Sequence, residues 1–570
     1  MRIRSINVRR FRSIERSGLA QCGGLNVLIG KNNAGKSNVL STIDLMHRHL
    51  QRGAIAGPWQ VQRPADEFTD RQTTRPIQIG IVFDLTEEVS LELRERLKAE
   101  APHLERSIEQ IKPEDTIAFI MSACLKGSTP FLFVEKIAVG TVNAEDHDLQ
   151  ADGMNLLSVS QAVAHELFAN QQETVGLRND IRALEGIIAD PNRLNFIFEN
   201  RERSSGYFFE GLFGPEIRAS QALVRQITTT MAGVPNVEEF RNRLTGLAAE
   251  MRDKAEKLEH RETEGTIGAF AGATKKPPSY ATWLMQQYGS VPMLHVRETR
   301  DPIGREEAEA LLNLKVTRGG PARLVGVQAT VRSLLGVEVD AFQAEQRRPG
   351  ARAAEMDIDK FLVEANGAGV REALRLVLDL ELKRPRLLLL EEPEAHLHPG
   401  LEHAVYSFLR DKSEETQMFV TTHSTNFVDS VSFQNIYLVS RDKHQRTVCD
   451  VLDAGEGALK IPAELGLRLS TVFMYDSLVF VEGPSDEAVL RELAKVLDID
   501  LARRNVGFVQ MGGVKNFAHY AAHATIELLS RRRIQMWFVT DRDERDDEEV
   551  NDMLTRLGDS AQLKVLERRE

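Results

Sequence analysis

The sequence has 570 residues, which at roughly 150 residues per domain allows two to four domains. Hydrophobic residues make up 42% and charged residues 27%, a globular mix that excludes a disordered chain, a collagen and a small disulfide scaffold. The net charge of −12 excludes a general attraction to nucleic acid, so any DNA contact must come from local basic patches.

The sequence also predicts where the protein works. Its longest purely aliphatic run, 387–390, is far shorter than the ~20 apolar residues that span a bilayer. The segment 1–11 alternates basic and apolar residues and lacks the apolar stretch of an export signal. The three cysteines, Cys22, Cys124 and Cys449, are far apart and form no zinc-binding spacing. We therefore expect a cytoplasmic protein with no membrane partner.

In the N-terminal part of the chain, 1–157, the sequence pattern predicts several strands and one helix. Ile3, Ile6 and Val8 alternate with basic residues, and 25–29 is a second apolar strand. A helix is predicted from Lys36 onward, with apolar residues at helical spacing at Val39, Leu40 and Ile43. Further alternating stretches at 76–85 and 131–139 indicate two more strands.

A glycine-rich motif, GKNNAGKS, occupies 30–37 between the strand at 25–29 and the following helix. It matches the P-loop pattern, in which glycines let backbone N–H groups point at phosphate oxygens and the helix presents its positive end. Lys36 is then expected to reach the β- and γ-phosphates of ATP, and Ser37 to supply a hydroxyl to Mg²⁺. The nucleotide-binding residues predicted in this motif are Gly30, Asn32, Asn33, Ala34, Gly35, Lys36, Ser37 and Asn38.

The middle of the chain, 158–290, reads as an α-helical insertion. Apolar residues recur there at steps of three and four, namely Val237, Phe240, Leu244, Leu247, Met251 and Leu258. This seam lasts about three heptads, the lower limit for a coiled coil. Two interpretations stay open: a helix within a bundle of this chain, or a helix that faces a second subunit and makes the insertion a dimerisation domain.

The next part, 291–460, carries an acidic strand end. The buried strand at 387–390 leads into Glu391 and Glu392, at the edge where ligands bind parallel sheets. Glu391 is expected to hold Mg²⁺, and Glu392 to orient and polarise the attacking water. The sequence TTHS at 421–424 follows another strand and places His423 where it could sense the γ-phosphate.

These motifs resemble those of ABC-type ATPases of the SMC and OLD (overcoming lysogenization defect) group, which split the ATPase around a long insertion. The resemblance implies that two heads sandwich ATP, with a glycine-rich stretch reaching across to the γ-phosphate. The segment VEANGAGVREAL from Val363 fits that stretch, and Asn366, Gly367 and Gly369 are the implied nucleotide contacts. Asn366 stands where the usual motif has serine.

The C-terminal part, 470–570, has a β-α-β-α-β pattern that predicts a small parallel sheet. Four carboxylates lie at or just after its strand ends: Glu482, Asp486, Asp541 and Asp543. Such a hard-oxygen cluster suits Mg²⁺ or Mn²⁺. Two ions of this kind can activate a water and stabilise a leaving 3′ oxygen, so Glu482, Asp541 and Asp543 are the predicted catalytic groups of phosphodiester cleavage.

This C-terminal arrangement is similar to a TOPRIM domain, with Glu-Gly after one strand and Asp-x-Asp after a later strand. An ABC-type head followed by TOPRIM is the layout of OLD-family nucleases. The resemblance implies an α/β fold and an ATP-regulated, metal-dependent DNA endonuclease, often of anti-phage defence, with DNA, a second copy of the chain and in some relatives a helicase-like protein as partners. TOPRIM domains of this group usually continue past the Asp-x-Asp, so two interpretations stay open here: a truncated chain or a reduced domain.

Other functions are weighed against this one. An ATPase sensor or scaffold with an inactive TOPRIM domain is the main alternative. A chromosome-structure protein of the SMC type is disfavoured, because about 100 interrupted helical residues are too few for long coiled-coil arms at ~1.5 Å per residue. A transporter ATPase leaves the second carboxylate cluster unexplained. Basic candidates for DNA contact are 503–504 and 531–533.

Overall fold

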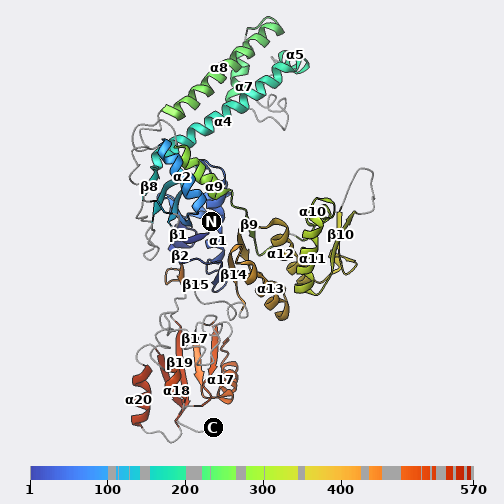
Figure 1. Ribbon diagram of the computed structural model, residues 1–570. Helices are drawn as coiled ribbons and strands as arrows, with labels where there is room; N and C mark the ends of the chain where they lie inside the picture. Colours follow the sequence, from blue (N-terminus) through green and yellow to red (C-terminus); the bar gives the residue numbers. More distant parts are fainter. Residues whose placement is uncertain are drawn as a thin grey trace. The chain divides into compact units, whose positions relative to one another are not determined.

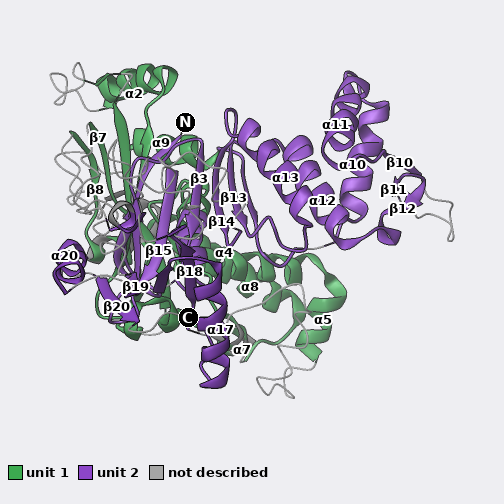
Figure 2. Ribbon diagram, turned by 90° about the horizontal axis from the view of Figure 1, so that it is seen from below, with its two compact units in different colours: residues 1, 45–143, 149–290 green, residues 2–44, 144–148, 291–570 purple. Residues whose placement is uncertain are grey.

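The computed structural model describes most of the chain (Figure 1). The described residues are 2–100, 111–112, 115–126, 129–140, 154–199, 221–231, 233–264, 278–300, 302–343, 354–424, 435–451, 475, 477–501, 504–513, 516–521, 534–542, 547–557 and 561–566. Among them, no helix combines the length and the apolar character needed to cross a membrane. The chain divides into two compact units, coloured separately in Figure 2: residues 1, 45–143 and 149–290 form unit 1, and residues 2–44, 144–148 and 291–570 form unit 2.

The strands are β1 (Ile3–Phe11), β2 (Ile14–Leu19), β3 (Leu25–Ile29), β4 (Ala56–Pro58), β5 (Ile77–Asp84), β6 (Thr116–Lys126), β7 (Thr129–Gly140), β8 (Met154–Ser158), β9 (Met293–Val296), β10 (Val339–Gln343), β11 (Ala354–Ile358), β12 (Phe361–Leu362), β13 (Leu387–Glu391), β14 (Gln417–Thr422), β15 (Ile436–Arg441), β16 (Thr447–Val451), β17 (Ser477–Val481), β18 (Val506–Gln510), β19 (Gln535–Asp541) and β20 (Ala561–Leu566).

The helices are α1 (Lys36–Gln51), α2 (Glu87–Glu100), α4 (Gln161–Ala189), α5 (Pro191–Glu199), α7 (Gln221–Met231), α8 (Val237–Glu264), α9 (Ser279–Gly289), α10 (Arg305–Val316), α11 (Gly320–Leu335), α12 (Ala368–Lys383), α13 (Pro399–Lys412), α17 (Pro484–Val496), α18 (Phe517–Tyr520) and α20 (Asp547–Leu557). The predicted strands at 25–29, 76–85, 131–139 and 387–390 correspond to β3, β5, β7 and β13.

The centre of unit 2 is a sheet of six described strands in the order β16-β15-β3-β14-β13-β9. The pairs from β15 through β3, β14 and β13 to β9 are parallel, and β16 is an antiparallel edge. β3 and β13 are buried at every position, as expected for strands covered on both faces. Because parallel strands end at the same edge, the segments after β3, β9, β13 and β14 lie together there.

A helical lobe that the sequence did not predict also belongs to unit 2. Figure 2 shows α10, α11 and α12 beside the antiparallel sheet β10-β11-β12. Leu311, Val331, Val339 and Leu374 are buried together in its core. The lobe is relevant to function because the glycine-rich segment at 363–369 leads into the first turn of α12, and α12 ends shortly before β13.

In unit 1, β5, β6 and β7 pair antiparallel, and β4 and β8 both pair with β7. The helices α4, α5, α7 and α8 form a separate apolar core, and α4 and α8 run side by side in Figure 1. Phe240 and Leu244 of the predicted seam are fully buried in this core, packed with Leu184 of α4 and other residues of the same chain.

The seam is therefore covered inside the chain itself. Apolar periodicity reports a buried face without saying which chain buries it, and the packing against α4 favours a helix within a bundle of this chain. Dimerisation through the insertion stays a prediction. The side chain of Leu258 lies outside the described residues.

The C-terminal sheet consists of the described strands β18-β17-β19-β20, all parallel. Its core includes Phe480 and Phe538, whose rings stack with centroids 4.4 Å apart. The predicted β-α-β-α-β pattern is present, with β20 as an additional strand. The second helix of this pattern is α18, which ends at Tyr520.

Candidate functional site

The P-loop joins β3 to α1 and needs glycine at two points for steric reasons. Gly35 has a φ of +107°, and a Cβ there would lie 2.1 Å from Thr447 Oγ1. A Cβ at Gly30 would lie 2.0 Å from the carbonyl oxygen of Val439. Side chains cannot occupy such space, so the two glycines let the loop pack against the β15–β16 hairpin as well as approach a ligand.

The hairpin holds this loop through side-chain hydrogen bonds. Thr447 Oγ1 donates to the carbonyl of Ala34 at 2.7 Å, and the hydroxyls of Thr447 and Ser13 lie 2.7 Å apart. Arg441 Nε donates to the carbonyl of Asn33 at 2.7 Å. Thr447 and Arg441 thus fix the loop from more than 400 positions away in the sequence.

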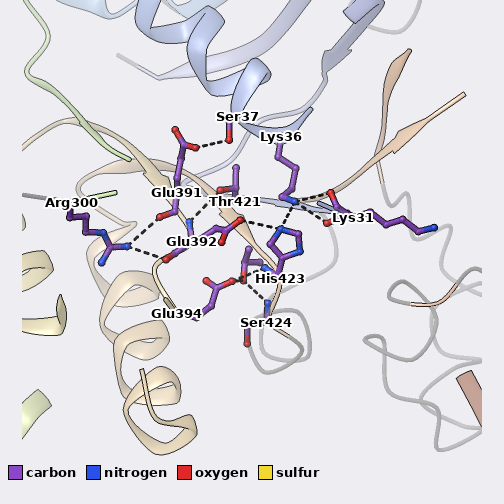
Figure 3. Close-up of polar contacts among 12 residues, drawn as sticks. Lys31, Lys36, Ser37, Arg300, Glu391, Glu392, Glu394, Thr421, His423 and Ser424 are labelled. Atoms are coloured by element: carbon purple, nitrogen blue, oxygen red, sulfur yellow. Dashed lines mark hydrogen bonds and ion pairs between the residues drawn. The ribbon is translucent and has the colours of Figure 1, made fainter. Parts of the chain in front are cut away.

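Lys36 is buried beneath the loop, with a relative exposure of 6%. Its ammonium donates to the carbonyls of Gly30 and Lys31 at 2.9 and 3.1 Å, and to His423 Nε2 at 2.7 Å (Figure 3). Burial lowers the pKa of Lys36 to about 8, against the opposing effect of nearby carboxylates, first of them Glu392. The P-loop lysine and the predicted sensor histidine are therefore direct neighbours.

Ser37 and Glu391 also meet. Ser37 Oγ donates to Glu391 Oε2 at 2.5 Å. The other carboxylate oxygen, Oε1, lies 3.0 Å from Nε2 of His295, whose Nδ1 lies 3.6 Å from Asp44 Oδ2. Burial would raise the pKa of Glu391, but the hydrogen bonds from His295 and Ser37 outweigh burial and lower it. A carboxylate held ionised next to a hydroxyl is a suitable ligand pair for Mg²⁺.

Glu392 turns out of the strand toward His423. Its backbone has a φ of +44°, a left-handed conformation that costs a non-glycine residue roughly 1–2 kcal/mol. Its Oε1 lies 3.1 Å from His423 Nε2, and its N–H donates to the carbonyl of Thr421 at 3.0 Å. Burial, and then the charge of Glu298, raise the pKa of Glu392. A general base benefits from a raised pKa, because it then accepts a proton more readily.

His423 itself is positioned by Glu394. Glu394 Oε1 accepts from the backbone N–H of His423 at 2.6 Å and from Thr422 Oγ1 at 2.8 Å. Burial lowers the pKa of His423, and the charge of Lys36 lowers it further. The neutral ring can accept from Lys36, while a protonated ring would donate to Glu392.

The glycine-rich segment at 363–369 lies at the beginning of α12. Asn366 donates through its N–H to the carbonyl of Val363 at 3.2 Å and through Nδ2 to that of Leu362 at 3.1 Å. Gly367 is the N-cap residue of α12, and a Cβ at Gly369 would lie 2.8 Å from the carbonyl oxygen of His396. The role of these residues toward a nucleotide in a second subunit stays a prediction.

The second carboxylate cluster is assembled only in part by the described residues. Glu482 Oε1 accepts from the backbone N–H of Asp541 at 3.0 Å, so these two strand ends do meet. Asp486 Oδ2 accepts from the N–H of Gly483 at 2.8 Å, which makes it a helix-capping residue of α17. Asp543 lies outside the described residues. Within the described ranges, no group of three or more His, Cys, Asp or Glu side chains is placed to hold a metal ion.

The residues at the two sites fit the bound groups that the sequence predicts: a nucleotide with Mg²⁺ at the first site and a divalent metal ion at the second. At the P-loop, a buried lysine, a hydroxyl and an ionised carboxylate converge under a glycine loop, as phosphate with Mg²⁺ requires. At the C-terminal sheet, Glu482 and Asp541 offer the oxygen donors that a hard divalent ion prefers. Of the predicted DNA contacts, 503 and 531–533 lie outside the described residues.

Several residues of the first site were not predicted from the sequence. His295 lies in β9, and Arg300 follows that strand and donates through Nη2 to the carbonyls of Glu391 and Glu392 at 3.2 and 3.1 Å. Thr447, the first residue of β16, also had no predicted role. The signal that could have pointed to Arg300 is its position in the fold. Arg300 follows the short strand β9, which ends at the same sheet edge as β13 and its acidic pair.

The fold and the two sites define a P-loop ATPase head joined to a small parallel α/β domain. Residues 1–155 match the family described as AAA ATPase domain, and residues 356–429 match the AAA domain described as putative AbiEii toxin, Type IV TA system. Residues 473–543 match the TOPRIM domain of overcoming lysogenization defect protein-like proteins. The chain thus has the domains of an OLD-family ATPase–TOPRIM protein, which confirms the resemblance and the α/β fold class. These domains imply the use of a nucleotide and a divalent metal ion.

Curated relatives match shorter parts of the chain. The OLD nuclease of Thermus scotoductus is 26% identical over 136 residues, which cover 22% of this chain and 26% of that protein. Endonuclease GajA of Bacillus cereus is 26% identical over 192 residues, covering 29% and 27%. The matched part spans about a quarter of the length of these relatives. A solved Smc head domain from Pyrococcus furiosus aligns with 81% of this chain and 99% of its own at a TM-score of 0.33 and 11% identity.

Proposed function

We propose that this protein binds and hydrolyses ATP with Mg²⁺ at the P-loop. The observation that carries the proposal is the convergence of Lys36, Glu392 and His423, with Ser37 and Glu391 beside them. Lys36 would contact the β- and γ-phosphates, Ser37 and Glu391 would hold Mg²⁺, and Glu392 would accept a proton from the attacking water. His423 would report the γ-phosphate, because it contacts both Lys36 and Glu392.

We further propose that the TOPRIM domain cleaves DNA with a divalent metal ion. The meeting of Glu482 and Asp541 supports this, as does the match to the OLD-like TOPRIM family. Bound Mg²⁺ or Mn²⁺ would supply an activated water and stabilise the leaving oxygen. Glu482, Asp541 and Asp543 are the proposed ligands. Similarity to proteins called OLD nuclease and Endonuclease GajA supports an endonuclease in anti-phage defence.

The proposed partners follow from the same resemblance. DNA is the substrate, a second copy of the chain is the partner that Asn366, Gly367 and Gly369 would require, and a helicase-like or other defence protein is the further partner class. We keep the reducing cytoplasm as the proposed location, since Cys22, Cys124 and Cys449 are all free and buried thiols.

The experiment that tests both activities is plasmid cleavage by the full chain with Mg²⁺ or Mn²⁺, with and without ATP, alongside phosphate release from ATP. Wild type is expected to release phosphate and to nick or cut the plasmid. Glu392→Gln should retain ATP binding and lose hydrolysis, because only water activation is removed. Wild type that neither binds nor hydrolyses ATP would overturn the first proposal, and wild type that leaves DNA intact with both metals would overturn the second.

One observation favours a second function, an ATPase sensor or scaffold with an inactive TOPRIM domain. Asp486 caps its helix, so the described residues bring only Glu482 and Asp541 together. Two carboxylates hold a divalent ion more weakly than three or four. ATP hydrolysis without DNA cleavage, together with weak Mn²⁺ binding in calorimetry, would establish this function instead.

A further inference from the structure

Arg300 is a buried arginine that contacts the acidic strand end and the first turns of α12 at the same time. Its side chain is 4% exposed. Nη2 donates to the carbonyls of Glu391 and Glu392, and Nη1 donates to Glu372 Oε2 at 3.1 Å. Figure 3 shows the guanidinium directed at the acidic pair. An arginine so deeply buried needs a reason, because its desolvation must be offset by these bonds.

The two carbonyls can share one nitrogen because of the backbone at Glu392. In an extended strand, successive carbonyls point to opposite sides. The left-handed φ of +44° at Glu392 breaks that alternation directly after β13 and brings both oxygens to Arg300. On its other side, the N–H of Glu392 donates to Thr421. Arg300 and Thr421 therefore hold the strained residue from both directions, while its carboxylate reaches His423.

The other end of the contact lies on α12. Glu372 is in the helix that begins after Gly367, and Gly369 of the same helix packs closely on the carbonyl of His396. His396 belongs to the segment that follows Glu392 directly. The beginning of α12 is thus linked to the acidic segment in two ways: directly through backbone packing at Gly369, and indirectly through Arg300, with which Glu372 forms an ion pair.

We propose that Arg300 is a positioning residue that couples the first turns of α12 to the backbone of Glu392, and so regulates ATP hydrolysis. The inference rests on the proposed ATPase function. A ligand or subunit that engages the segment at 366–369 would shift α12, and the Glu372–Arg300 pair would transmit that shift to the carbonyls of Glu391 and Glu392. Small displacements matter there, because misplacing a catalytic group by about 1 Å can cost roughly 100-fold in rate.

The test uses the full chain, three single variants and the double variant that combines Arg300→Lys with Glu372→Gln. Arg300→Lys keeps the charge but removes the planar fork that serves three acceptors. Glu372→Gln breaks the ion pair and leaves the carbonyl contacts in place. Arg375→Lys is the matched control, because Arg375 also lies on α12 but pairs with Glu307 and Asp379. Two readouts are measured: amide hydrogen exchange of segment 391–397 without nucleotide, and kcat and Kd for ATP.

Coupling predicts a specific pattern. Arg300→Lys and Glu372→Gln should both speed exchange in segment 391–397, by about tenfold, although Glu372 contacts neither carbonyl itself. The kcat for ATP should fall about tenfold in Arg300→Lys with Kd within about twofold, and the double variant should lose no more than Arg300→Lys alone. The control should change neither readout by more than about twofold.

Unchanged exchange in Glu372→Gln would overturn the inference, and so would an equal loss in Arg375→Lys. If wild type hydrolyses no ATP, the proposed function fails, and the exchange measurement alone decides the coupling.

Discussion

The molecule contains two acidic strand ends that arise in similar ways and are assembled differently. Both follow parallel strands: β13, which is buried at every position, in one sheet, and the partly buried β17 and β19 in the other. At β13, the carboxylates meet Ser37, His295 and His423, which come from three other elements. At β17, Glu482 accepts from the backbone of Asp541 and Asp486 from that of Gly483.

The difference concerns what fixes the geometry before any ligand binds. The first site is held by side-chain contacts from many elements, so its arrangement is present in the protein itself. At the second site, the carboxylates of Glu482 and Asp486 accept from backbone amides, and bringing further carboxylates together requires a cation to offset their repulsion. We therefore expect the first site to depend on individual side chains and the second to depend on metal.

The largest expected effect tests this dependence at the second site. Asp541→Ala should lower the DNA cleavage rate by roughly 10²–10³-fold, because a charge that holds the metal ion is lost. ATP hydrolysis should stay near wild type, since Glu391 and Glu392 are the carboxylates proposed for the other site. Plasmid nicking and phosphate release are measured in parallel.

Asp552→Ala is the control for this variant, because Asp552 lies on α20 and pairs with Arg556. If the wild-type chain does not cut DNA, calorimetry with Mn²⁺ replaces the cleavage assay. Unchanged Mn²⁺ binding in Asp541→Ala would show that Asp541 is an ordinary strand-end residue and not a metal ligand.

The next effect concerns the first site. Lys36→Ala should weaken ATP binding about 100-fold, because two charge-assisted contacts to phosphate are worth roughly 3 kcal/mol. Equilibrium binding of a fluorescent ATP analogue measures the change. Lys31→Ala, at an exposed position of the same loop, should stay within about twofold of wild type. Equal losses in both variants would contradict the role of Lys36.

A smaller effect is expected at the hairpin that braces the P-loop. Thr447→Val keeps the shape but removes a hydroxyl that contacts Ala34 and Ser13. Leaving the buried carbonyl of Ala34 without this donor should lower the free energy of unfolding by about 1–2 kcal/mol, measured by chemical denaturation. Thr555→Val on α20 serves as the comparison, because the Thr555 hydroxyl donates to a carbonyl of its own helix. Its expected change is under about 0.5 kcal/mol, and an equal loss in both variants would contradict the bracing role.

The smallest expected effect concerns Asp486, and it decides most directly whether the second acidic strand end holds a metal ion through this residue. If Asp486 only completes the capping box of α17, Asp486→Asn should be nearly neutral for stability and cleavage, because the amide oxygen of asparagine can still accept from the N–H of Gly483. Asp486→Ala should cost about 1 kcal/mol of stability. Thermal unfolding and plasmid cleavage distinguish the two roles: strong loss of cleavage in Asp486→Asn with unchanged stability would make Asp486 a metal ligand.

Much of the fold could be predicted because it depends on short local patterns. The run at 387–390 and the glycine motif at 30–37 each specify a buried strand or a tight loop within a few residues. The helical lobe of α10, α11 and α12 escaped prediction, because its helices bury narrow faces and lack a long seam. The seam in α8 was recognised, but its partner α4 was not, since periodicity does not identify the covering surface.

The residues of the first site that lie in motifs could be predicted from the sequence, but the residues that hold them in place could not. Lys36, Glu391, Glu392 and His423 stand in recognisable contexts, and the structure brings them together. Arg300 donates hydrogen bonds to the carbonyls of two residues about 90 positions further along the chain. Every residue has a backbone carbonyl, so these acceptors leave no mark in the sequence. No local pattern encodes such a contact, and only the topology that sets β9 beside β13 makes it visible.

The position of β3 in its sheet has a consequence for synthesis of the protein. Its neighbours are β14 and β15, whose residues leave the ribosome after the whole insertion has been made. At about 5–20 residues per second, the roughly 400 intervening residues take about 20–80 s. Throughout that time the apolar strand LNVLI lacks both of its final partners. The P-loop can therefore form only late in translation, and nascent chains should occupy chaperones until β15 has emerged.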